Sequence, residues 1–241
     1  MKKLILASAL IAIFASSCKK NKPDVPAPPP SPYTTSTANS VWYYQNTDTS
    51  GTPDITNDTT KSTNRDTTVS SIVYHVYTNT ALGDNEYRKV NAVNATDNDY
   101  VQLFNTDFDG TTPVYAPYIY LKDYLALNGS WTQNFTVKIN GTSAPASITN
   151  TIMEKGISRT VNGQAYTDVV HVQSVLNTSF TINFPPFPPI PVTVTRTEQL
   201  YYARRFGLIE SSTIQTINAP GLPGFPQTNA TSSKLSSAVL L

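Results

Sequence analysis

The chain is short of the residues that most often carry chemistry or lock a small fold. Its 241 residues include one cysteine and two histidines, and charged residues make up only 14% of the total. A single cysteine excludes a disulfide within the chain, so the fold must depend on its apolar core. The formal net charge of +1 excludes the strongly basic surface that is typical of nucleic-acid-binding proteins.

The sequence also lacks the motifs of common enzyme classes. It has no G-x-S-x-G nucleophile elbow, no H-E-x-x-H zinc motif and no phosphate-binding glycine loop. Asp168 and His171 are three residues apart, which on a strand places them on opposite faces. Glu198 and Glu210 fall on neighbouring predicted strands, but no pattern places them in a cleft. We therefore expect a protein that is not an enzyme and needs no cofactor.

One segment has the start of a calcium-binding loop. It begins at Asn105 and ends at Gly110, with the sequence N-T-D-F-D-G. The acid that such loops carry six residues after the glycine is absent, because Ala116 stands there. We expect a turn, with a weak Ca²⁺ site as the alternative. His75 and His171 are expected in ordinary sheet positions, so the sequence predicts no metal site.

The N-terminus has the pattern of an export signal. Residues 1–17 run from two lysines through an apolar stretch to small residues. The apolar stretch is shorter than the about 20 residues that span a bilayer. Residues 15–18 (A-S-S-C) resemble the lipobox of bacterial lipoproteins, although alanine stands where a lipobox usually has leucine. The resemblance implies cleavage between Ser17 and Cys18 and acylation of Cys18; an ordinary secretory signal with an incidental cysteine is the alternative.

Residues 18–38 are expected to form a tether. Six prolines lie between residues 23 and 32, and proline-rich chains extend by about 3 Å per residue. Three lysines just after Cys18 are either a hydrophilic spacer or a weak attraction to anionic lipid. Surface-exported lipoproteins of the Bacteroidota type often carry acidic residues at this place. The basic tether therefore favours an envelope protein at the outer membrane that faces the periplasm.

Residues 39–241 are expected to form one all-β domain. They are rich in Thr, Ser, Asn and Tyr and poor in Glu, which favours strands over helices. The clearest strand is residues 131–140, where apolar and polar residues alternate as in a half-buried antiparallel strand. Residues 46–66 are polar and are predicted to be a loop, and residues 122–126 fit either strand or helix. We predict a strongly curved, half-barrel-like antiparallel sheet with at most short helices.

Three stretches carry a family resemblance. They are residues 125–131 (L-A-L-N-G-S-W), 161–172 (V-N-G-Q-A-Y-T-D-V-V-H-V) and 201–210 (Y-Y-A-R-R-F-G-L-I-E). In this order they resemble uncharacterised Bacteroidota-type envelope lipoproteins, whose domain is similar to the half-barrel sheets of periplasmic lipoprotein carriers. The sequence departs from the pattern at residues 204–206 and in a Pro/Phe insertion at 185–191. The shared motifs are mostly apolar, so the resemblance implies a fold and leaves activity open.

Two functions remain open. The first is a binding module that holds an apolar ligand on the concave face of the sheet. The candidate contact residues are Trp131, Phe135, Val137, Val170 and Val172. The alternative is a structural or interaction protein that docks an envelope partner through its outer face or through an apolar loop with Phe184, Phe187 and Ile190. That loop can equally fold over the open end of the sheet as a lid.

Overall fold

The protein is all-β, as the sequence predicts. The computed structural model describes residues 31–80, 85–107, 113–139, 141–183 and 188–241. Within these residues every regular element is a strand, so none is an apolar helix long enough to cross a bilayer. The strands are β1 (Val41–Asp48), β2 (Asp54–Val69), β3 (Ile72–Asn79), β4 (Asn85–Ala92), β5 (Asn98–Asn105), β6 (Tyr115–Lys122), β7 (Ser130–Ile139), β8 (Thr142–Val161), β9 (Gln164–Ile182), β10 (Ile190–Ala203), β11 (Gly207–Asn218) and β12 (Gln227–Val239).

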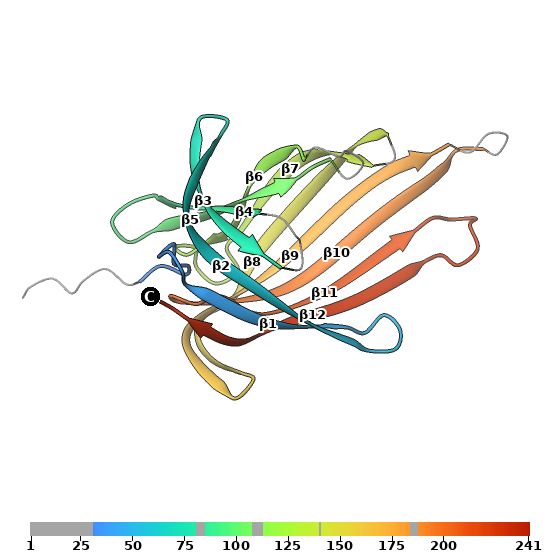
Figure 1. Cartoon of the computed structure of the whole chain (residues 1–241). Coiled ribbons are helices and arrows are strands. Elements are labelled where there is room, and N and C mark those ends of the chain that lie inside the picture. Colours follow the sequence, from blue (N-terminus) through green and yellow to red (C-terminus); the bar gives the residue numbers. More distant parts are fainter. Residues whose placement is uncertain (1–30, 81–84, 108–112, 140, 184–187) are drawn as a thin grey trace, which may run out of the picture.

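The order of the strands explains why the sheet curls. The twelve strands form one sheet in the order β6-β5-β4-β3-β2-β1-β12-β11-β10-β9-β8-β7. The chain therefore reaches one edge at β6 and continues at the opposite edge with β7. If the sheet were flat, these edges would lie about 50 Å apart, but the seven residues 123–129 that join them span at most about 25 Å. The edges must approach each other, and the sheet becomes a nearly closed barrel (Figure 1).

Side chains, with little help from the backbone, close the seam between β6 and β7. Trp131 Nε1 donates a hydrogen bond to the carbonyl oxygen of Ile119 at 2.9 Å, and the amide of Ile119 donates to Gln133 Oε1 at 2.7 Å. Near the other end of β7, the amide of Lys138 donates to the carbonyl oxygen of Thr106, in the segment that follows β5, at 2.8 Å. These bonds satisfy backbone groups that an open sheet edge leaves unpaired.

The loop predicted for residues 46–66 is wrong. Most of this range is strand, because β1 continues to Asp48 and β2 pairs with β1 on one side and β3 on the other. Asp58, Thr60 and Ser62 are alternate residues of β2, and their side chains point into the barrel and are buried. Since the inward residues are polar, β2 shows no hydrophobic alternation by which a strand is recognised. Residues 122–126, which fit either strand or helix from the sequence, are neither beyond Lys122: β6 ends at that residue and a turn follows.

The core at one end of the barrel includes a residue from before β1. Tyr33 is fully buried, and its amide donates to the Tyr100 hydroxyl at 3.0 Å. The Arg204 guanidinium lies over the Tyr33 ring, 4.5 Å from its centroid. The packed part of the chain thus extends N-terminal to residue 39, into the end of the predicted tether. The C-terminus meets the same end, because the Leu241 amide donates to Ser40 Oγ (Figure 1).

The barrel has a short wall and a long wall. Strands β3 to β6 have 8 residues each, whereas β8 has 20 and β9 has 19. The tips of β9 to β12 therefore project beyond the short wall, at the end away from the C-terminus (Figure 1). At about 3.3 Å per residue, β9 alone is roughly 60 Å long. The loops at these tips lie far from the end where the packed chain begins.

Candidate ligand-binding cavity

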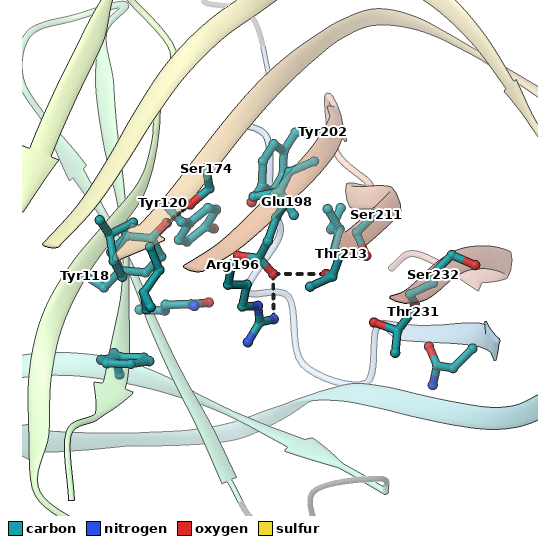
Figure 2. Close-up of a pocket in the computed structure, with 18 residues that line it drawn as sticks. Tyr118, Tyr120, Ser174, Arg196, Glu198, Tyr202, Ser211, Thr213, Thr231 and Ser232 are labelled. Carbon is teal, nitrogen blue, oxygen red and sulfur yellow. Dashed lines mark hydrogen bonds and ion pairs between the residues drawn. The ribbon is translucent and has the colours of Figure 1, made fainter. Parts of the chain in front are cut away.

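The interior of the barrel contains a cavity of about 490 Å³. Its lining comes from β1, β5, β6 and from β8 to β12, so both walls of the barrel contribute (Figure 2). This volume lies within the range of about 300–1,000 Å³ that is usual for small-molecule sites. The curved sheet thus surrounds a space of ligand size, which ligand binding on its concave face requires.

A row of polar residues crosses the interior face of five strands. Strand pairing sets each of these residues directly opposite the next, from β8 to β12. Because residues opposite each other in adjacent strands point to the same face, the row forms a continuous belt. The residues of this polar row are Asn150, Ser174, Glu198, Thr213 and Thr231.

The polar row lies between apolar rows on the same face. Ile152, Val172 and Leu200 are aligned on one side of it, and Ile148 with Leu176 on the other. The cavity wall therefore combines apolar surface with a narrow band of hydrogen-bonding groups. Such a wall orients a bound molecule, since apolar contact supplies affinity and a few polar groups select the pose.

Tyr118 connects the short wall to the polar row. Its hydroxyl donates to Asn150 Oδ1 at 3.0 Å and lies 3.4 Å from Ser174 Oγ. Burial raises the pKa of Tyr118 to about 12, so its hydroxyl remains a neutral donor at physiological pH. Asn150 is fully buried, and its Nδ2 has no hydrogen-bond partner among the described residues. A buried donor without a partner is costly, so this group marks a place for a further polar atom.

The aromatic side of the cavity includes two more tyrosines. The rings of Tyr120 and Tyr202 pack with centroids 5.5 Å apart. Burial raises the pKa of both hydroxyls. We call Phe104, Tyr118, Tyr120 and Tyr202 the aromatic wall.

The opposite side of the cavity is rich in hydroxyl groups. We call the residues whose hydroxyls face the cavity the hydroxyl wall: Ser211, Thr213, Thr231 and Ser233. Figure 2 shows labelled members of this wall on one side of the cavity, with Tyr118 and Tyr120 on the other. Thr213 donates to Glu198, but no side-chain hydrogen bond joins any other hydroxyl of this wall to a described residue. The three hydroxyls of Ser211, Thr231 and Ser233 are therefore available to a ligand or to water.

One ion pair lies between the two walls. Arg196 donates to Glu198 Oε1 at 2.6 Å, and the Thr213 hydroxyl donates to the same oxygen at 3.3 Å. The second carboxylate oxygen of Glu198 makes no hydrogen bond to a described residue. Glu198 and Glu210 do not face each other as an acid pair, because Glu210 pairs with Arg159 at 2.6 Å. Arg196 and Glu198 are the charged residues of the described lining, so its formal charge is zero.

A second ion pair lies inside the short wall. Arg88 and Glu86 of β4 bond to each other, and the Arg88 guanidinium lies 4.8 Å from the centroid of the Tyr77 ring. Asn79 Nδ2 donates to Glu86 Oε1 at 2.7 Å. Burial opposes the charge on Arg88, but Glu86 and the surrounding tyrosines together outweigh it and raise the pKa of the guanidinium. Sequence reasoning missed this pair, because inward-facing charges on a strand resemble solvent-exposed ones in the sequence.

The apolar residues predicted to hold a ligand support the cavity but do not line it. Val170 and Val172 are fully buried, and Val137 is nearly so. Trp131 and Phe135 are partly buried and pack against the same cores. The cavity therefore lies beside these residues, and the side chains that line it are not the ones predicted to contact a ligand. Sequence reasoning did not identify the polar row as part of the cavity wall. Its residues become recognisable only when the pairing register of the strands is known.

The predicted apolar loop is described only in part. Phe184 and Phe187 lie outside the described residues, whereas Ile190 begins β10. Residues 188–191 and 220–222 line an apolar groove of about 600 Å³ at the tips of the long wall. The two proline-rich loops therefore lie close together, which the sequence does not reveal.

The two histidines have ordinary surroundings. His75 Nδ1 lies 2.8 Å from Asp66, and His171 Nδ1 lies 3.0 Å from Glu154. His171 makes no hydrogen bond to Asp168, in keeping with their opposite faces on the strand. Within the described ranges, no group of three or more His, Cys, Asp or Glu side chains is arranged to hold a metal ion.

Other predicted sites lie wholly or partly outside the described residues. Ser17 and Cys18, the predicted cleavage and acylation positions, are not described. The segment from Asn105 to Gly110 is described as far as Asp107, whose amide donates to Asn105 Oδ1 at 3.1 Å. The described half of this segment thus has a turn-like hydrogen bond.

Comparison with known proteins adds little to this geometry. No protein-family model matches the sequence, and no curated protein matches it. Among solved structures, the chain is similar to a Bacteroides fragilis protein that is inferred to be exported and has a YmcC-like fold. The identity is 10% and the TM-score is 0.46, over 87% of this chain and 99% of that chain. At this level of similarity, no function is transferred to the present chain.

Proposed function

We propose that this chain is a non-enzymatic, lipid-anchored binding protein of the bacterial envelope, which holds a small ligand inside its barrel. The observation that carries the proposal is the cavity of about 490 Å³ with three hydroxyls that no described side chain bonds. The only carboxylate of the described lining, Glu198, is held by Arg196 and Thr213. This arrangement suits binding better than proton transfer, because the acid has no second titratable partner for catalysis.

The lining favours a ligand with a polar edge over a purely apolar one. Covering an unbonded hydroxyl with an apolar group costs roughly 1–3 kcal/mol. Burying one methylene contributes only about 0.8 kcal/mol. An acyl chain against the hydroxyl wall therefore loses on each covered hydroxyl as much as one to four methylenes supply. The apolar ligand expected from the sequence is thus replaced in our proposal by one that also forms hydrogen bonds.

A matched pair of variants tests the binding function. Ser211 points into the cavity, and its neighbour Ser212 is exposed on the outer face of β11. Native mass spectrometry of the mature chain from envelope preparations is expected to show a bound small molecule. Ser211→Trp is expected to lose it, because the indole occupies the cavity, whereas Ser212→Trp keeps it. A wild-type chain without bound mass, or a Ser211→Trp chain that retains it, contradicts binding in this cavity.

The lipid anchor has its own test. We propose that acylated Cys18 holds the protein at the outer membrane, facing the periplasm. A Cys18→Ser chain, exported through an ordinary secretory signal, is expected in the soluble periplasmic fraction, while the natural chain fractionates with membranes. Replacing Lys19 by Ser, with Cys18 intact, is the control and leaves the chain in the membrane fraction. Equal membrane association of the Cys18→Ser chain rules out this anchor.

A second candidate function is docking of an envelope partner through the tips of the long wall. The observation that favours it is the apolar groove between residues 188–191 and 220–222. This groove lies at the end of the barrel away from the residues that precede β1 (Figure 1), so a tethered barrel can present it away from its own membrane. Placing a photo-cross-linker at Leu222 tests this function, with the exposed residue Ser212 as the control position. Cross-linked partners that are common to both positions count against it.

A further inference from the structure

We infer that the cavity holds a neutral, ring-shaped, polyhydroxylated molecule, of which a saccharide is the chemical class. The inference rests on the proposed binding function and adds the nature of the ligand. Three observations carry it: the chemistry of the two walls, the neutrality of the lining, and the unused hydrogen-bonding groups.

One wall of the cavity is aromatic and the other carries hydroxyls, which matches the apolar face and the hydroxylated edge of a sugar ring. The aromatic wall offers the packed rings of Tyr120 and Tyr202. The hydroxyl wall offers serine and threonine side chains, which lie across the cavity from Tyr118 and Tyr120 (Figure 2). A pyranose has an apolar C–H face that packs on aromatic rings. Its periphery carries hydroxyl groups that both donate and accept hydrogen bonds, as serine and threonine hydroxyls do. An acyl chain matches the first wall only.

The charges of the lining favour a neutral ligand over one with a charged head group. Arg196 and Glu198 neutralise each other at 2.6 Å. An anionic ligand beside Arg196 also meets the negative charge of Glu198, and a cationic ligand beside Glu198 also meets the positive charge of Arg196, so the pair favours neither sign. A neutral ligand keeps the pair intact and adds to it, because the second oxygen of Glu198 still accepts a hydrogen bond. Carboxylate oxygens bond strongly to neutral hydroxyl donors.

The unused groups are arranged for several hydroxyls at once. The free oxygen of Glu198 and the hydroxyl of Thr231 belong to one polar row, two strands apart, with Thr213 between them. Ser211 and Ser233 face each other in the next row. Adjacent strands are about 4.8 Å apart, so these groups meet different hydroxyls of one ring. A molecule with a single polar group can satisfy only one of them.

The test measures saccharide and acyl binding to the same protein. The full mature chain with Cys18→Ser, which needs no detergent, is titrated with glucose, N-acetylglucosamine, maltose and cellobiose, and separately with dodecanoic acid. Saturation-transfer NMR is the readout. We expect saturable binding of at least one saccharide, with the C–H face of the ring closest to the protein, and no saturable binding of dodecanoic acid.

Variants assign the binding to the cavity. Glu198→Gln is expected to weaken saccharide binding at least 10-fold, and Ser211→Ala with Ser233→Ala is expected to weaken it in the same direction. Ser212→Ala, on the outer face, leaves it unchanged. Thermal melting of each variant shows whether the fold is retained, and if Glu198→Gln does not fold, the double alanine variant decides.

Each result has a defined meaning. Binding of dodecanoic acid alone overturns the saccharide inference and leaves the binding function intact. Binding of a saccharide that is unaffected by Glu198→Gln and by the double variant places it elsewhere and also overturns the inference. If neither class of probe binds, and the chain from envelope preparations carries no bound mass, both the inference and the proposed binding function fail.

Discussion

The seam between β6 and β7 gives the sharpest test of the barrel. Gln133→Ala removes the acceptor of the Ile119 amide, which it binds at 2.7 Å. An unpaired backbone amide costs roughly 1–3 kcal/mol when buried. Ile119 is only half-buried, so water replaces part of the bond and we expect a loss of about 1–2 kcal/mol in the free energy of unfolding. For a chain of this length, that corresponds to a fall in Tm of about 2–8 °C.

Hydrogen exchange locates the effect at the seam. In Gln133→Ala the amide of Ile119 is expected to exchange roughly 5- to 30-fold faster, the factor that corresponds to about 1–2 kcal/mol. Asn134→Ala is the control, because Asn134 is the next residue of β7 and its amide side chain is exposed on the outer face. Surface substitutions of this kind change stability by about 0.5 kcal/mol or less.

Two outcomes refute this account of the seam. The first is equal melting of Gln133→Ala and Asn134→Ala. The second is unchanged exchange of the Ile119 amide in Gln133→Ala. Either result means that the β6 edge is held by something other than the side chains of β7.

Trp131→Phe, which keeps an aromatic ring but removes the Nε1 donor to Ile119, is expected to have a smaller effect in the same direction, because it leaves a carbonyl oxygen that water can reach.

Two further predictions concern buried tyrosines. Tyr33→Ala is expected to lower the free energy of unfolding by about 3–5 kcal/mol, as for other large buried side chains, since Tyr33 is 0% exposed. Tyr43→Ala is the control, because Tyr43 is 42% exposed. Equal losses of the two variants in urea titrations contradict packing of the residues before β1. Tyr118 has a pKa of about 12 in the folded protein against 10.0 for the free side chain, so the stability that it contributes is complete below pH 10 and is lost as the pH rises toward 12. The full loss, reached above pH 12, is about 3 kcal/mol at roughly 1.4 kcal/mol per pKa unit, and about 2 kcal/mol of it is expected by pH 11.5. Denaturation at pH 9 and pH 11.5 should therefore show a weaker pH dependence for Tyr118→Phe. The same dependence in both chains contradicts the burial of this hydroxyl.

The extent to which the fold could be predicted differs from strand to strand. The alternation from Trp131 to Ile139 correctly predicts β7, because its inward residues other than Gln133 are apolar and its outward residues are polar. The same rule fails for β2, where Asp58, Thr60 and Ser62 are buried and point inward. Polar residues on both faces of a strand read as a loop, although pairing on both sides and an enclosed interior make this segment a strand.

The candidate site shows the same limit more clearly. Apolar residues such as Val170 and Val172 are recognisable in the sequence as the concave face, and they do lie in the core behind the cavity. Glu198 is also visible as an acid on a predicted strand. Its partners across the sheet, Ser174 and Thr213, are not visible, because they are ordinary residues in a chain full of serine and threonine.

From the amino acids alone follow the signal-like N-terminus, the β composition and the face of each strongly alternating strand. These are local properties, since they depend on residue type and on spacing within a few positions. Closure of the sheet, the join at Gln133 and the polar row through Glu198 depend on register between strands that lie far apart in the chain. Register is settled by the packing of the whole barrel, and a shift of a single residue would turn every one of these side chains to the outer face.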